Sequence, residues 1–479
     1  MWNYRGILII TTLLSACTVG PDYSPPAPNL HTQRWAAVPE KATQGLRFRC
    51  ADTKWWQSFH DPLLNQYIDL ATNHNLDIGI SQQRLLQARA LRNAVHAEGG
   101  PQIDGTGSVT SEHISQYGRI LGLFPNNPIF QNIPLTRKVY EPGFDASWEL
   151  DIFGQRTRKN QRSSADEQAA IADVGDTVRQ IRAELARNYF DLRANQQRTA
   201  ILQRNIALQE KTLALTRQRL KAGSDNQLSV ELSKSQLQNS KAQLPSLQAR
   251  SWALAAQIAL LLGQEPMDVW PELSKVKPLP TVPSKIAVGL PSDLLRRRPD
   301  IAKAERMIAA ATAEIGVAVA DLYPKFNLTA DVALESLYLN TLWRSKSSIW
   351  TIGPFMQWAL FHSGQIHANI HRREAEQGEA VLQYQKTVLN ALREAETALD
   401  GFQRAQQSSS AFSKAVKANQ RTVRLSNQRY TEGEDNILTL IQVQQDLLTV
   451  ETSEIDAKQN TLVQLVSLYK AVGGEWDIG

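Results

Sequence analysis

The part of this sequence closest to a catalytic or metal-binding pattern is a group of three histidines. His367 and His371 are spaced i, i+4, so a helix would place both imidazoles on one face, and His362 lies shortly before them. No glutamate lies between them in an HExxH pattern, and no third ligand is evident nearby. The sequence also lacks a GxxxxGK[ST] phosphate loop. The pattern favours a solvated helix face, and we predict no enzymatic activity, no metal site and no cofactor.

The two cysteines, Cys17 and Cys50, bear on where the chain is located. Cys17 follows a basic residue, an apolar run over residues 7–14 and two small residues, which is the order found in a secretory signal. The apolar run is shorter than the roughly 20 residues that a membrane-spanning helix needs. One interpretation is a lipoprotein signal in which Cys17 is acylated, and the other is an ordinary signal peptide with an incidental cysteine. The end of the run at the lipobox position favours the first. Cys50 is predicted to be a buried apolar residue.

The charges give little support to a nucleic-acid partner. The chain has 52 Lys and Arg against 47 Asp and Glu, and the two signs are interspersed without a basic run. Hydrophobic residues make up 42% of the 479 residues, and the mean hydropathy is −0.34. We therefore predict a largely water-contacting protein with two or three domains and no nucleic-acid binding.

Equivalent residues recur in the two halves of the chain. Trp148 and Trp358 lie 210 positions apart, and so do Gly223 and Gly433. The same spacing relates Gly154 to Gly364, Arg219 to Arg429, Asp225 to Asp435, Asn226 to Asn436 and Gly263 to Gly473. Upstream the spacing is 223, as for Pro101 and Pro324, so the first half carries 13 additional residues, including the loop at 124–128. This recurrence predicts an internal duplication.

Each half is predicted to begin with a helix and two strands. Apolar residues at a helical period predict one helix from Pro62 to about Ala97, which Gly99-Gly100-Pro101 ends. Strands are predicted at residues 102–110, 144–151, 325–334 and 350–360. The last three alternate apolar and polar side chains. This alternation is typical of a half-buried sheet in a soluble domain, or of a transmembrane β-barrel wall with lipid outside and water inside.

A long helix, a turn and a returning helix are predicted after each pair of strands. The long helices cover residues 155–222 and 364–432, neither of which contains proline. Apolar residues recur every seven positions along two seams, so each helix should have two helical neighbours, in a closed ring or in an ordinary bundle. Gly223 and Gly433 end these helices, and a Ser or Asp is expected to cap the next one.

These patterns divide the chain into six predicted segments. They are a signal peptide (1–16), a lipidated proline- and tryptophan-rich N-terminal arm (17–60) that is expected to be extended, a first repeat (61–263), a stiff proline-rich crossover (264–291), a second repeat (292–473) and a C-terminal tail (474–479).

Two strands per repeat are too few to close a membrane barrel. A four-stranded sheet cannot surround an open lumen, and a free sheet edge in lipid leaves unpaired backbone groups that cost several kcal/mol each. A cyclic assembly removes free edges, and three chains would supply twelve strands, a plausible pore size. The membrane interpretation therefore predicts a homotrimer.

Four motifs resemble those of the TolC-like outer-membrane efflux proteins, in the lipoprotein branch typified by OprM and NodT. They are Cys17-Thr18-Val19-Gly20-Pro21-Asp22-Tyr23, the segment from Gly289 to Ile301 with Arg298-Pro299-Asp300, Leu322-Tyr323-Pro324, and the segment from Tyr469 to Trp476. The resemblance covers nearly the whole mature chain. It implies an α+β fold and a trimer in which a 12-stranded transmembrane β-barrel continues into a long periplasmic α-helical barrel. An equatorial collar would include the arm and the crossover.

The resemblance also implies a function and a location. The chain would be the exit duct of a tripartite efflux system that exports drugs or other toxic solutes and contributes to multidrug resistance. Its partners would be a periplasmic adaptor (membrane fusion) protein and an inner-membrane transporter of the resistance-nodulation-division type. It would lie in the outer membrane, anchored by a palmitate on Cys17, and extend into the periplasm. Two alternatives stay open: a non-conducting coiled-coil scaffold lipoprotein, and the outer-membrane duct of a type I protein secretion system.

The resemblance places the functional residues at the helix tips. The family's aperture residues match Arg429, Tyr430 and Asp435 here, with helix packing as the alternative role of Arg429 and Tyr430. A family aspartate aligns with Gln442, and we predict that Asp446, one helical turn later, replaces its charge unless it is an ordinary solvated residue. The adaptor is expected to contact the turns at Gly223, Ser224, Gly433 and Glu434. Arg219, the counterpart of Arg429, is a weaker candidate.

Overall fold

The computed structural model describes residues 18–26, 35–36, 46–47, 54–115, 117–118, 134–283, 286–287 and 291–473. Cys17, Cys50, the loop at 124–128 and the tail at 474–479 lie outside the described residues, so the expectations for them stay predictions. The chain divides into two compact units. The first comprises Met1–Pro25, Gln87–Gln168 and Arg306–Leu382, and the second comprises Pro26–Leu86, Ala169–Glu305 and Gln383–Gly479.

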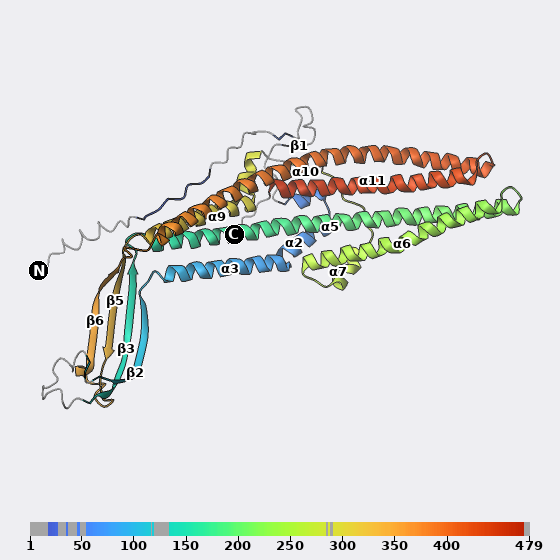
Figure 1. Cartoon of the computed structure of the whole chain (residues 1–479). Helices are drawn as coiled ribbons and strands as arrows, with labels where there is room; N and C mark the ends of the chain where they lie inside the picture. The colour runs from blue at the N-terminus through green and yellow to red at the C-terminus, as the bar shows by residue number, and fades with distance from the viewer. Residues whose placement is uncertain are drawn as a thin grey trace. The chain divides into compact units, whose positions relative to one another are not determined.

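The first unit contains a four-stranded antiparallel sheet (Figure 1). Its strands are β2 (Gln102–His113), β3 (Thr136–Leu150), β5 (Lys325–Leu334) and β6 (Ser348–Gln357). Their order in the sheet is β2-β3-β5-β6. Within one chain, β2 and β6 are therefore the edge strands.

The bounds of β5 match the sequence prediction, and those of the other three strands differ from it. β2 and β3 are longer than predicted because their hairpin continues beyond the last pairing of β3 with β5. In this outer part of the hairpin, Glu112 lies directly opposite Arg137 in the strand register, and their side chains form an ion pair. β6 begins two residues earlier than predicted and ends at Gln357, opposite Lys325, where β5 begins.

The single helix predicted for residues 62–97 is two helices, α2 (Pro62–His74) and α3 (Leu76–Ala97). Asn75 separates them in an extended conformation, with φ −65° and ψ 133°. Its side-chain oxygen accepts hydrogen bonds from the N–H groups of Asp77 and Ile78, and its amide donates to the carbonyl of Leu261 at 2.9 Å. Asparagine competes for main-chain partners in this way, and the prediction of one helix was wrong because periodicity does not reveal such a cap.

Two long helical hairpins extend through the second unit (Figure 1). The first consists of α5 (Gln155–Lys221) and α6 (Gln227–Leu262), and the second of α10 (Gln365–Glu432) and α11 (Ile437–Val472). Each returning helix packs along its partner, as the hydrogen bonds between α5 and α6 and between α10 and α11 show. The prediction of long helices followed by returning helices is confirmed, with ends within one or two residues of those expected.

The turns of the two hairpins have the same construction. Gly223 (φ 73°) and Gly433 (φ 87°) adopt the left-handed conformation that ends a helix, which costs glycine little because it lacks a Cβ. Asn226 and Asn436 cap the next helices, each accepting a hydrogen bond at 3.0 Å from the N–H three residues later. The prediction that a serine or aspartate would cap these helices was wrong. The aspartate before each asparagine instead accepts from the asparagine N–H.

The arm contains a short helix where extended chain was expected, and the stiff crossover contains one as well. Trp55–Phe59 forms a 3₁₀ helix (η1), and Pro266–Leu273 forms α7, with proline at a position that helix starts tolerate. The two segments also meet, because β1 (Leu46–Arg47) pairs in parallel with β4 (Ile286–Ala287). The remaining elements are η2 (Pro291–Asp293), α8 (Leu294–Arg297), α9 (Pro299–Ala320) and η3 (Ser345–Ser347).

Aromatic side chains of the arm help to form the core of the second unit. Trp55 stacks on Tyr469 with ring centroids 5.3 Å apart, and Phe59 contacts Phe190 edge-on at 5.0 Å. All four are buried, and such pairs contribute about 0.5–1.5 kcal/mol beyond their burial. This core joins the chain before α2 to the long helices. Among the helices that the structure describes, none is long and apolar enough to cross a membrane.

Candidate functional site

The sheet of the first unit has one exposed apolar face. Phe144, Val332 and Trp350 lie side by side on neighbouring strands and are 65%, 55% and 72% exposed. The same face carries further exposed apolar side chains: Ile103, Val109, Trp148, Leu328, Ile352 and Met356. A continuous exposed apolar surface of this kind marks contact with a membrane or with another protein.

The opposite face of the sheet is mostly polar, apart from Ile349 and Phe355 on β6, and includes a row of carboxylates. Asp104, Asp145 and Asp331 lie directly opposite one another on β2, β3 and β5. Like charges in directly opposed positions destabilise a sheet unless water and mobile ions screen them. This face is therefore suited to contact with water and unsuited to packing against an apolar layer.

Two tryptophans occupy matching positions at the helical end of the sheet. The indole N–H of Trp148 donates to the carbonyl of Gly99, and that of Trp358 donates to the carbonyl of Leu322, both at 3.0 Å. Both rings are partly exposed. An exposed indole with a satisfied N–H is typical of the boundary between lipid and water.

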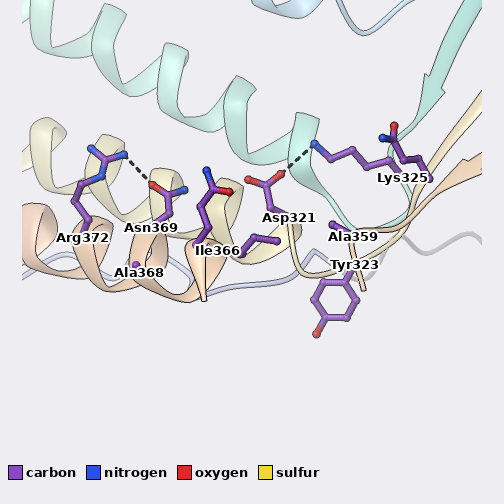
Figure 2. A pocket seen from close by; sticks show the side chains of 10 residues that line it. Asp321, Tyr323, Lys325, Ala359, Ile366, Ala368, Asn369 and Arg372 are labelled. Atoms are coloured by element: carbon purple, nitrogen blue, oxygen red, sulfur yellow. Dashed lines mark hydrogen bonds and ion pairs between the residues drawn. The ribbon is translucent and has the colours of Figure 1, made fainter. Parts of the chain in front are cut away.

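An open pocket of about 730 Å³ lies where β5, β6 and the start of α10 meet. Lys325 pairs with Asp321 at 3.0 Å, and Arg372 donates to Asn369 at 2.8 Å. Figure 2 marks both contacts with dashed lines. Arg372 also pairs with Glu376 at 2.7 Å. Because both cations already have anionic partners, the pocket offers no free charge for an anionic ligand, and we assign it none.

His367 and His371, which were predicted to share a helix face, have different partners. His367 stacks instead on His362, with ring centroids 5.8 Å apart, and His371 Nδ1 lies 2.9 Å from a carboxylate oxygen of Glu374. Across the described ranges, no group of three or more His, Cys, Asp or Glu side chains could hold a metal ion.

The turns of the two hairpins are joined by a network centred on Tyr430. This tyrosine is only 1% exposed, and its hydroxyl lies 2.9 Å from Asp225 Oδ2 and 3.0 Å from Thr216 Oγ1. The Arg219 guanidinium lies over the ring, 4.9 Å from its centroid, and donates to the carbonyl of Tyr430. The end of α10 is thus held by side chains from α5 and from the turn that follows α5. We refer to Thr216, Arg219, Asp225 and Tyr430 as the tip network.

Burial and the hydrogen bonds of the tip network shift the pKa values of Tyr430 and Asp225 in opposite directions. Burial raises the pKa of Tyr430, and its hydrogen bond to the Asp225 carboxylate adds to this rise. Burial also acts to raise the pKa of Asp225, but hydrogen bonds with Ser229, the Asn226 N–H and Tyr430, together with the charge of Arg219, hold it below its usual value. The carboxylate is therefore ionised near neutral pH and accepts a charge-assisted hydrogen bond from the Tyr430 hydroxyl.

The other residues predicted for the aperture lie outside this network. Arg429 is exposed and lies 3.9 Å from Glu434. Gln442 donates to Asp446 at 2.9 Å, and both side chains are exposed. Asp435 accepts a hydrogen bond from the next residue in its own turn. Of the predicted aperture residues, the structure brings only Tyr430 into contact with the other hairpin through this network.

Sequence reasoning missed Thr216 and Asp225 and ranked Arg219 too low. A signal for two of them was present, because Arg219 and Asp225 recur as Arg429 and Asp435. The halves differ at two positions of the tip network, since Leu220 stands at the position equivalent to Tyr430 and Ser426 at the position equivalent to Thr216. Tyr430 reaches across from the second hairpin to Asp225 and Thr216, and Arg219 reaches back from the first hairpin to the Tyr430 carbonyl.

Comparisons with known proteins agree with the resemblance in the motifs. The outer membrane efflux protein family matches residues 67–264 and 290–474. Nodulation protein T of Rhizobium leguminosarum bv. viciae is 29% identical, over 97% of this chain and 92% of its own length. Toluene efflux pump outer membrane protein TtgI of Pseudomonas putida is 28% identical, over 97% of each chain.

Solved structures show the same fold. The structure of the outer-membrane channel OprN is 30% identical in sequence, with a TM-score of 0.88 over 96% of this chain and all of that one. The Campylobacter jejuni CmeC outer membrane channel also has a TM-score of 0.88, over 97% of this chain and 96% of its own. At 20% identity the second likeness concerns the fold alone.

Proposed function

Because the chain belongs to the outer membrane efflux protein family, we propose that it is the exit duct of a tripartite efflux system. The duct passively exports drugs or other toxic solutes across the outer membrane. An inner-membrane transporter of the resistance-nodulation-division type delivers them, and a periplasmic adaptor protein connects the two. The relatives include an outer membrane protein of a toluene efflux pump and an outer-membrane channel, which supports this assignment.

The observation that carries the proposal is the sheet with two exposed faces of opposite character. The apolar face is suited to lipid, and the face with Asp104, Asp145 and Asp331 is suited to a water-filled lumen. The free edges of β2 and β6 would each leave backbone groups unpaired in lipid. Three chains that pair β6 of one with β2 of the next form a closed, fully antiparallel barrel of twelve strands.

The helices form the periplasmic part of the duct in the same trimer. Both halves have the same order of elements, with long helices of 67 and 68 residues and returning helices of 36 residues each. This order supports an internal duplication, with repeats at 61–263 and 292–473. Three copies of the two hairpins close into a helical barrel. The arm (17–60) and the crossover (264–291), joined by β1 and β4, contribute to a collar around it.

The aperture is proposed to lie at the tips of the hairpins. Arg429, Tyr430, Asp435, Gln442 and Asp446 surround it, and the contacts of Tyr430 with the first hairpin hold it closed. The adaptor contacts the turns themselves, at Gly223, Ser224, Gly433 and Glu434. If Asp446 supplies the charge that Gln442 lacks, Asp446→Ala changes the ion preference of single channels. Unchanged conductance and ion preference would remove Asp446 from the aperture.

The mature N-terminus is proposed to be an acylated Cys17 that anchors the chain to the outer membrane after removal of residues 1–16. Mass spectrometry of the N-terminal peptide tests this directly, since acylation adds the mass of the fatty acids. An unmodified peptide that begins with Cys17 would show an ordinary signal peptide.

The proposed function is tested with the detergent-solubilised full-length chain. We expect native mass spectrometry to show three copies, and planar bilayers to show ion conductance. Cysteine scanning along Phe144–Leu150 should give residues labelled by water-soluble reagents alternating with residues protected by lipid. A monomer without conductance, labelled on both faces of the sheet, would support the scaffold lipoprotein instead and overturn the duct.

A further inference from the structure

The segment that follows Cys17 is bound along α5 and α9 of the first unit. The N–H of Val19 donates to the carbonyl of Phe153, in the turn between β3 and α5, at 3.2 Å. From the first turn of α5, Arg158 donates to the carbonyls of Val19 and Gly20, at 3.1 Å each. Three main-chain groups of two successive residues are therefore held by hydrogen bonds, which do not depend on the side chains of the segment.

Arg158 depends on this segment for most of its hydrogen bonds. Its side chain is 3% exposed, and its other partners are Gln161 at 3.0 Å and Asp22 at 2.9 Å. Three of its four partner residues thus lie in the N-terminal segment. A buried guanidinium without partners is strongly unfavourable, and its planar fork can bind several oxygens at once. Arg158 is therefore satisfied only while the segment is in place.

Three glycines leave room for the backbone of the segment. A Cβ on Gly20 would lie 2.6 Å from the Cα of Gly316 on α9, and a Cβ on Gly316 would lie 2.7 Å from the Arg158 side chain. A Cβ on Gly154 would lie 2.6 Å from the Thr18 side chain. Real Cβ atoms do not make such short contacts with backbone, so a side chain at Gly20 would displace the segment from α9.

We propose that Arg158, Gly154 and Gly316 form a docking site that fixes the acylated N-terminus at the junction of sheet and helices. This inference rests on the proposed acylation of Cys17. Thr18, the next residue in the sequence, contacts Gly154, and β3 ends at Leu150. The anchor is thereby held at the end of the strands whose apolar face is proposed to enter the membrane. If the segment were flexible instead, the position of the anchor relative to the strands would not be fixed. Ordering the segment during insertion would then cost conformational entropy.

The test is hydrogen–deuterium exchange of the segment at 18–26 in the full-length trimer. We expect Gly20→Val and Arg158→Ala to accelerate exchange of the Val19 amide by about tenfold or more, which corresponds to losing about 1.4 kcal/mol of protection. Arg158→Lys keeps the charge but not the fork, and should give an intermediate rate. Gly20→Val alters only the segment, so it remains informative if an Arg158 variant misfolds.

The matched control is Arg162→Ala, one turn further along α5. This variant removes ion pairs with Asp166 and Glu314 and leaves the partners of the segment intact. It should leave Val19 protection as in wild type. Equal losses in Arg162→Ala and Arg158→Ala, or wild-type protection in both Gly20→Val and Arg158→Ala, would overturn the docking site.

A Cys17→Ser chain exported with a cleavable signal peptide separates docking from acylation. Because the docking contacts begin at Thr18, this chain should show wild-type protection of Val19, and loss of protection would show that the site does not itself hold the segment. Conductance of the same samples in planar bilayers is scored independently. A conducting trimer with an unprotected segment refutes only the docking site, whereas a protected segment in a non-conducting monomer refutes only the duct.

Discussion

At the scale of single residues, the two arginines before the turns have different surroundings. Arg219 lies over the Tyr430 ring and donates to its carbonyl, whereas Arg429 is exposed with a distant partner in Glu434. An exposed ion pair contributes about 0–1 kcal/mol to stability. Removal of one partner from a buried hydrogen bond costs about 1–3 kcal/mol, because the other partner is left unsatisfied. Leak through the tips should therefore depend on Tyr430 and Arg219 more than on Arg429.

The first prediction compares Tyr430→Phe, Arg219→Ala and Arg429→Ala. The first two should raise the open probability of the tip about 5- to 30-fold and increase the closed-state conductance accordingly. This factor corresponds to a loss of about 1–2 kcal/mol of contact between the hairpins. Arg429→Ala should raise it little. Planar-bilayer recordings measure these values. If Arg429→Ala leaks as much as Tyr430→Phe, gating does not depend on the contacts of Tyr430.

The second prediction concerns the pH dependence of the tip. The pKa of Asp225 is held below its ordinary value of 3.8, so its contribution to the closed tip is present above that value and is lost as the pH falls through the lowered pKa. Closed-state conductance should stay constant from about pH 7 to pH 5 and rise only below about pH 4. Asp225→Asn should leak at all pH values without the acid-dependent rise. A wild-type increase already between pH 7 and 5 would contradict this account.

At the scale of elements, the break at Asn75 shows how one side chain divides a helix. Its amide donates to Leu261, at the end of α6, and its oxygen caps α3. The side chain is 5% exposed, so neither group has water as a substitute partner. The break between α2 and α3 therefore involves a contact between residues 186 positions apart.

The third prediction is that Asn75→Ala destabilises the chain by about 2–3 kcal/mol. The cap accounts for about 0.5–2 kcal/mol, and the unsatisfied carbonyl of Leu261 adds to this. Thermal unfolding of the solubilised protein measures the change. Asn73→Ala is a suitable control, because Asn73 is an exposed asparagine on α2 whose amide bonds only to its own helix. Equal stability of both variants would show that the break does not need this cap.

At the scale of the whole molecule, the row of aspartates can affect ion passage only in the closed barrel. In one chain, Asp104, Asp145 and Asp331 form a short row on an open sheet. In the proposed trimer the row repeats three times and becomes a ring of carboxylates around the lumen. Such a ring favours cations over anions in the pore.

The fourth prediction is a shift in selectivity when the ring is neutralised. The double substitution Asp145→Asn and Asp331→Asn should move the reversal potential in a salt gradient toward that of a non-selective pore. Stability should hold or increase, since opposed like charges are removed. Asp268→Asn serves as the control, because that exposed aspartate lies on α7, outside the sheet. An unchanged reversal potential would place the row outside the conduction path.

The sequence by itself determined most of the elements. Strict alternation bounded by Pro324 defined β5, and the glycines at 223 and 433 defined the ends of the long helices, because both signals act over a few neighbouring residues. The motifs were sufficient to indicate the family, which the comparison confirmed.

Only the tertiary structure decided which of two equivalent residues is used. By the spacing of 210, Arg219 is equivalent to Arg429 and Asp225 to Asp435. In the structure, Tyr430 contacts Arg219 and Asp225, the first member of each pair. The same holds for Asn75 and for Arg158, whose partners lie 186 and 138–139 residues away. A sequence pattern reflects the effect of a residue on its own helix or strand. Hydrogen bonds between distant segments form only after packing has brought their atoms together, so the pattern does not reveal them.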